Sequence, residues 1–117
     1  MREFLRCGAS TAAFLILVAT APVAAADCAP PPRAPAMPQG ATATDDEMKE
    51  GHDKLQNYVK LLEAYQTCMD LQIKSAPSDT KPEVKAQWQA NSDAAIEAAH
   101  EIADIYSAQL RAYKARQ

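Results

Sequence analysis

Glycine and histidine are scarce in this 117-residue chain, which holds three glycines and two histidines. A phosphate-binding loop needs several glycines within a few residues, and Gly40 and Gly51 are too widely spaced to form one. His52 and His100 are the residues that titrate near neutral pH, and neither has a serine or cysteine at a spacing that indicates nucleophilic activation. The composition therefore predicts that the protein is not an enzyme.

Cysteine and clustered basic charge are also limited. The three cysteines include no Cys-x-x-Cys pair, the arrangement typical of thiol oxidoreductases. The 12 basic and 15 acidic residues are dispersed along the chain, whereas binding to nucleic acid needs lysine and arginine gathered against phosphates. We therefore expect no nucleic-acid partner.

One long uncharged run is present, from Cys7 to Ala26, and it follows the basic residues Arg2 and Arg6. Its centre, residues 13–18, is strongly apolar, and it ends in the small residues Ala24–Ala26. A basic start, an apolar centre and a small-residue end are typical of a secretory signal peptide. We predict that residues 1–26 are a signal peptide.

Cleavage is expected before Asp27. An uncleaved membrane anchor is one alternative, because the run is about long enough to span a bilayer, but much of it is Ala, Gly, Ser and Thr. A lipoprotein is another; Asp27 stands before Cys28, where lipid attachment needs a small residue. Removal of residues 1–26 lowers the 12 basic and 15 acidic residues to 10 and 14, a net charge of −4. The remaining residues 27–117 make one small domain.

Export sets the expected state of the cysteines. Cys7 is removed with the signal, so Cys28 and Cys68 remain in a compartment that permits disulfides. We predict a Cys28–Cys68 disulfide in a periplasmic or secreted protein. Two free thiols and an intermolecular bridge stay open as alternatives.

Residues 27–43 form a proline-rich arm with five prolines between Cys28 and Gly40. Proline excludes helix and favours the extended polyproline II conformation. From Cys28 to Thr44 the arm can span ~50 Å as polyproline II, and Thr44 to Cys68 along a helix is ~36 Å. The arm is therefore long enough to turn at Gly40 and return to Cys68.

A first helix is expected over residues 45–74. Thr44 and Glu47 have the spacing of a capping box. Apolar residues then follow at alternating intervals of three and four, with Gly51 in the one gap, which is the pattern of a coiled-coil surface: Met48, Leu55, Tyr58, Leu62, Tyr65 and Met69.

A second helix is expected over residues 81–115, after a loop in which Pro77 ends the first helix. Thr80 and Glu83 suggest a second capping box. Its apolar stripe comprises Val84, Trp88, Ala95, Ala98, Ala99, Ile102, Ile105, Tyr106 and Tyr113. Because the loop is short, we predict an all-α fold in which residues 44–117 form an antiparallel two-helix hairpin, with the arm clamped to it by the disulfide.

The expected register follows from the centre of the loop. Residues that face each other should have numbers that sum to about 156, as in a helical hairpin centred near Ser78. This places Trp88 beside Cys68, Leu55 beside Ile102, and Gly51 opposite Ile105 and Tyr106. The missing side chain of Gly51 would then leave room for an aromatic ring.

Three residues are weak candidates for a metal site. Met48 and His52 are one helical turn apart and could supply soft ligands for copper, with His100 as a further imidazole. Two ligands do not make a site, and Met48 is expected in the core. A Glu-x-x-His motif at Glu97 and His100 faces away from the expected core. We therefore expect no metal and no cofactor.

The order Cys28-Ala-Pro-Pro-Pro, Tyr65-Gln-Thr-Cys68 and Leu110-Arg-Ala-Tyr113-Lys resembles a group of small exported proteobacterial proteins. These proteins pair a Cys–Pro-rich start with a Tyr-x-x-Cys helix and a second helix, and no activity is assigned to them. The resemblance covers most of residues 27–117. It implies the disulfide and the exported location, and it implies no mechanism.

The absence of catalytic motifs and the two long amphipathic helices together predict a function. We expect a non-enzymatic interaction or support module of the bacterial envelope, acting on a protein partner or by self-association, without membrane contact after signal cleavage. A periplasmic protein that binds a metal or a small ligand is the alternative.

Overall fold

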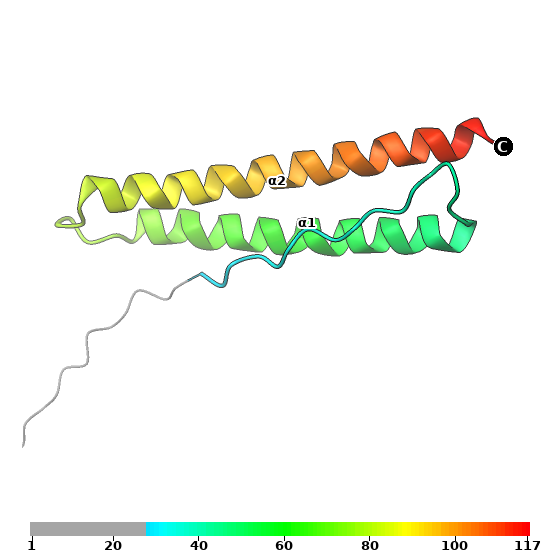
Figure 1. Ribbon diagram of the computed structural model, residues 1–117. Helices are drawn as coiled ribbons and strands as arrows, with labels where there is room; N and C mark the ends of the chain where they lie inside the picture. The colour runs from blue at the N-terminus through cyan, green and yellow to red at the C-terminus, as the bar shows by residue number, and fades with distance from the viewer. Residues whose placement is uncertain (1–27) are drawn as a thin grey trace, which may run out of the picture.

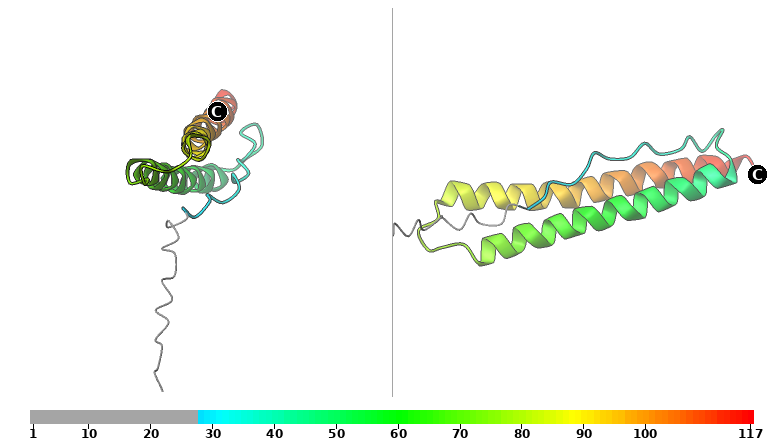
Figure 2. Two further views of the ribbon diagram at one scale, coloured as in Figure 1. Left: turned by 90° about the vertical axis from the view of Figure 1, so that its left-hand side faces the viewer. Right: turned by 90° about the horizontal axis from the view of Figure 1, so that it is seen from below.

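The computed structural model describes residues 28–117, so the predicted signal peptide lies outside the described residues. Two helices, α1 (Asp45–Lys74) and α2 (Pro82–Ala115), run antiparallel and in close contact, and residues 28–117 contain no strand. Residues 28–39 run in extended form along one side of both helices, and residues 40–42 make a turn before α1 (Figures 1 and 2). The described chain is thus a helical hairpin with an arm beside it. No helix in this part of the chain is long and apolar enough to cross a membrane.

The start of α1 is fixed by a complete capping box. The Glu47 backbone N–H donates to Thr44 Oγ1 at 3.2 Å, and the Thr44 backbone N–H donates to Glu47 Oε2 at 2.7 Å. The hydrogen bond from the Thr44 backbone N–H favours the ionised carboxylate, so the pKa of Glu47 lies below its ordinary value. Two N–H groups that the helix leaves without partners are therefore satisfied.

The second capping box does not form, and that prediction is wrong. The N-cap of α2 is Lys81, which makes no side-chain cap, and the helix begins at Pro82. Proline has no N–H and its fixed φ suits the first helical position, so this helix needs one partner fewer at its start. The Thr80 backbone N–H closes the preceding loop by donating to the Pro77 carbonyl at 3.0 Å.

The core lies between the helices in two adjoining groups of buried side chains. One contains Tyr58, Leu62, Ala95 and Ile102, and Leu55 packs against it. The other contains Ala43, Met48 and Tyr106. Leu55 therefore packs with the cluster that holds Ile102, as the expected register requires. Met37 of the arm packs against both groups, so the arm contributes to the core.

The residues at the edges of the predicted stripes are less buried than expected. Ile105, expected to face Gly51, is 43% exposed, and the buried Tyr106 alone occupies that place. Val84 in the first turn of α2 is 38% exposed. A hairpin of two helices can bury only a narrow strip of each, because no third helix covers the flanks.

Candidate functional site

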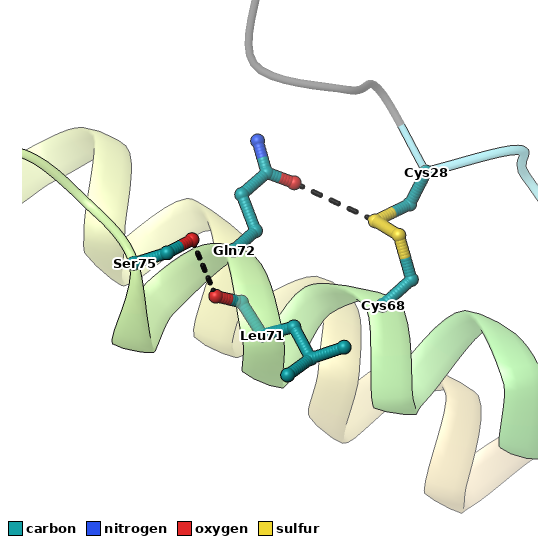
Figure 3. The surroundings of a disulfide bond; sticks show 5 residues. All are labelled: Cys28, Cys68, Leu71, Gln72 and Ser75. Carbon is teal, nitrogen blue, oxygen red and sulfur yellow. Dashed lines mark hydrogen bonds between the residues drawn. A yellow bond between two sulfur atoms is a disulfide. The ribbon is translucent and has the colours of Figure 1, made fainter.

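The arm is held at its first residue by a disulfide. Cys28 and Cys68 are joined with a Cα–Cα distance of 5.8 Å, in the pairing that the sequence predicts (Figure 3). Gln72 Oε1 lies 3.5 Å from Cys28 Sγ. A disulfide sulfur carries no proton, so in the oxidised protein this approach is a packing contact and not a hydrogen bond. Cys28 is buried, which places the bond against the hairpin.

The other end of the arm is a tight turn, here called the elbow, formed by residues 39–43. Thr42 and Ala43 donate their backbone N–H groups to the Gln39 carbonyl at 3.0 and 2.8 Å. The Gly40 backbone N–H donates to Gln109 Oε1 at 2.9 Å. A Cβ added to Gly40 would collide with the backbone of Gln109. Only glycine therefore allows the elbow to approach α2 this closely.

The end of α2 holds the elbow through Arg116. Its Nε donates to the Gly40 carbonyl at 3.0 Å, and its Nη2 donates to the Ala43 carbonyl. The guanidinium also lies over the Tyr113 ring, 4.8 Å from the ring centre. The binding of two carbonyls by Arg116 depends on tertiary contacts, which no local spacing in the sequence signals.

Tyr113 joins the end of α2 to the start of α1, two segments that are far apart in the sequence. Its hydroxyl donates to Asp45 Oδ1 at the start of α1. This hydrogen bond, together with the nearby negative charge, raises the pKa of the Tyr113 phenol above its ordinary value near 10.

We predict a measurable consequence for the titration of Tyr113. In the folded protein it should ionise at a higher pH than in the unfolded chain, so the interaction stabilises the fold below pH 10 and is lost as pH rises through the raised pKa. Asp45→Asn should lower this pKa, measured by the NMR shift of the Tyr113 ring carbons. Asp46→Asn removes the same charge from an exposed neighbour and should leave it unchanged. If both substitutions lowered the pKa of Tyr113 by the same amount, the hydrogen bond between Tyr113 and Asp45 would be contradicted.

A cavity of about 390 Å³ lies between the arm and α1. Met37, Pro38, Glu50, Gly51 and Lys54 are among the residues that line it. Glu50 and Lys54 form an ion pair of 2.7 Å across one turn of the helix. The arm and the helix surface therefore border an open hollow here.

At Gly51 the arm packs directly against the backbone of α1. A Cβ built on Gly51 would lie 2.5 Å from Cδ and 2.7 Å from Cγ of Pro38, and 3.6 Å from the Tyr106 ring. The expected partner, Tyr106, leaves ordinary van der Waals space, so the ring does not demand glycine. The constraint comes from Pro38.

We predict that Gly51→Ala has opposite effects in the oxidised and reduced protein. In the oxidised protein the new methyl group should push Pro38 outward and lower the free energy of unfolding by roughly 1 kcal/mol or more. Once the disulfide is reduced the arm can move away, and the gain of about 1 kcal/mol from replacing a helical glycine should dominate. Urea denaturation with and without dithiothreitol measures both values. Gln56→Ala, at an exposed site on α1, should give the same small change in both states. A stabilising Gly51→Ala in the oxidised protein would show that Pro38 does not pack there.

The three candidate metal ligands do not converge. Met48 is 4% exposed in the core, while His52 lies on the surface with its ring centre 5.8 Å from that of Tyr106. His52 and Met48 line one hollow of about 320 Å³ together with Asp45 and Tyr113. His100 is exposed on α2. Within residues 28–117 no three side chains from His, Cys, Asp and Glu gather closely enough to hold a metal ion.

One buried polar contact was missed by the sequence analysis. Ser92 is 1% exposed, and its hydroxyl donates to Asp70 Oδ1 at 3.1 Å across the two helices. Ser92 stands between Trp88 and Ala95 at the spacing of the apolar stripe, so its inward position could have been found. Its partner could not, because Asp70 lies on the flank of α1.

Comparisons with protein-family models, with curated proteins and with solved structures found no match to this chain.

Proposed function

We propose that this chain is a small, exported, non-enzymatic helical protein of the bacterial envelope that acts as an interaction or support module. The disulfide clamps the proline-rich arm along the hairpin. The observation that carries the proposal is that an arm without secondary structure is fixed at both ends, by Cys28–Cys68 and by the Gly40–Arg116 elbow contacts. Because the arm is already fixed, it loses little conformational entropy when a partner binds, so it can serve as a rigid binding surface.

The surface available for partners includes apolar side chains outside the core. Leu61, Leu71, Val84 and Ile105 are between 38% and 61% exposed. A shallow groove of about 380 Å³, lined by Leu55, Val59 and Ala103 among others, remains open on the hairpin. Apolar patches bordered by polar residues are typical of protein-interaction surfaces.

Site-specific photocrosslinking in a Gram-negative host tests this proposal. A photoreactive amino acid at Leu71 or Val59 should form discrete adducts with another protein or with a second copy. The photoreactive amino acid placed at Asp93, an exposed polar position on α2, should form none.

The protein recovered from the periplasm should begin at Asp27. Absence of adducts at every apolar position, or retention in the cytoplasm, would contradict the proposal. Sedimentation of the purified protein then distinguishes self-association from a separate partner.

A metal-binding protein is the second candidate, favoured by the shared hollow of Met48 and His52. Titration calorimetry with copper and with zinc measures it directly. Heat that disappears in the His52→Ala, His100→Ala double variant would support this function. Absent heat, or heat unchanged in that variant, would eliminate it.

A further inference from the structure

One face of α1 carries the arm, and its residues follow the spacing of a continuous stripe. Gly51, Lys54, Tyr58 and Leu61 succeed each other at intervals of three and four, so they lie on one side of the helix. We call this face the arm groove. Tyr58 and Leu61 line a hollow of about 130 Å³ with Pro32 and Pro35, and Gly51 lies against Pro38.

The prolines that meet the arm groove recur every third residue. Pro32, Pro35 and Pro38 have the period of a polyproline II helix, in which every third side chain lies on the same edge. The edge that carries these prolines therefore lies along α1, with Pro35 and Pro38 half-buried and Pro32 exposed at the rim of its hollow. Pro30 is exposed and lines neither of the hollows that the other prolines border.

The chemistry of the groove suits such an edge. The tyrosine ring offers a flat surface and leucine an apolar side chain for proline rings, and a glycine lets one ring reach the helix backbone. A polyproline II segment keeps its backbone solvated without internal hydrogen bonds, so it needs no backbone partner from the helix. Domains that bind proline-rich peptides use aromatic-lined grooves in this way.

The arm does not fill the groove completely. Leu61 remains 40% exposed beside it, and the 390 Å³ cavity that Met37 and Pro38 help to line stays open. Incomplete contact implies weak intrinsic affinity, which the covalent tether converts into permanent occupancy. A tethered segment competes at an effective concentration in the millimolar range.

We propose that the arm groove is a binding site for proline-rich peptides with a proline at every third position, and that the arm is its tethered occupant. This inference rests on the proposed function, since it names the class of segment that the interaction module binds. The disulfide and the elbow keep the site occupied in the oxidised protein. A peptide gains access when the arm's own proline edge is weakened.

Fluorescence anisotropy with a labelled peptide of residues 30–39 tests the inference on the full chain from Asp27 to Gln117. The protein variant is Pro32→Ala, Pro35→Ala, Pro38→Ala with the disulfide intact, so it keeps its covalent link. We expect this variant to bind the peptide at least tenfold more tightly than the wild type. A peptide in which the same three prolines are alanine should lose at least tenfold in affinity. Pro30→Ala, at an exposed proline that lines neither hollow, should behave as the wild type.

Two further measurements decide the outcome of the experiment. Adding Gly51→Leu to the triple variant should abolish binding, because the side chain would occupy the place of Pro38. Circular dichroism must show the same helix content in each variant. Equal peptide affinity of wild type and triple variant, or no saturable binding by a triple variant that retains its helices, would overturn the inference. Failure here combined with photocrosslinks in the envelope would leave the interaction module intact and remove only the peptide site.

Discussion

Reduction of the Cys28–Cys68 disulfide is expected to lower the free energy of unfolding by about 3–4 kcal/mol. The bond joins residues separated by 40 positions, so it closes a long loop and restricts the unfolded chain strongly. For a domain of this size the corresponding fall in melting temperature is roughly 15–30 °C. Thermal unfolding followed by circular dichroism, with and without dithiothreitol, measures the difference.

The structural consequence of reducing the disulfide is a weaker attachment of the arm to the hairpin. Without the bond, residues 28–38 keep only packing contacts, of which Met37 and Pro38 are the main ones. The elbow should stay in place through Arg116. The control is the Cys28→Ser, Cys68→Ser variant, whose melting temperature should equal that of the reduced protein and should not respond to dithiothreitol. Equal melting temperatures of the oxidised and reduced wild type would contradict a stabilising bond.

Leu62→Ala is expected to cost roughly 2–5 kcal/mol. Leu62 is 2% exposed at the centre of the contact between the helices, in a cluster of four buried residues. The core is thin, so the lost methyl groups are a large share of it. Because small domains have little stability to spare, the variant should be partly unfolded at room temperature.

Leu71→Ala is the matched control, because it makes the same change on the same helix at a residue that is 61% exposed. Its effect should stay within about 0.5 kcal/mol. Urea denaturation gives both free energies. Similar losses at the two positions would mean that the helices do not meet along the face that contains Leu62.

Local rules predicted the helices well. The three–four spacing of apolar residues and the Thr44–Glu47 capping box led to a first helix over the range at which α1 is found, Asp45–Lys74. Loop length alone led to the register that brings Leu55 to the cluster of Ile102. These features depend on neighbours in sequence or on simple hairpin geometry, which explains their predictability.

The remaining features depend on where distant segments meet. The capping box at Thr80 and Glu83 has the correct residue types, yet Pro82 as the first helical residue shifts the N-cap to Lys81. The role of Gly51 was assigned to an aromatic ring, whereas Pro38 imposes the closer limit. The Ser92–Asp70 and Arg116–elbow contacts join residues far apart in the chain, which no single-sequence pattern reveals.

The central claim is that one intramolecular disulfide fixes the proline-rich arm to the hairpin. Thiol titration of the protein that begins at Asp27, denatured without reductant, tests it most directly. The account predicts no free thiol per chain, two after reduction, and a monomer on a non-reducing gel. Two free thiols before reduction, or a covalent dimer, would contradict it.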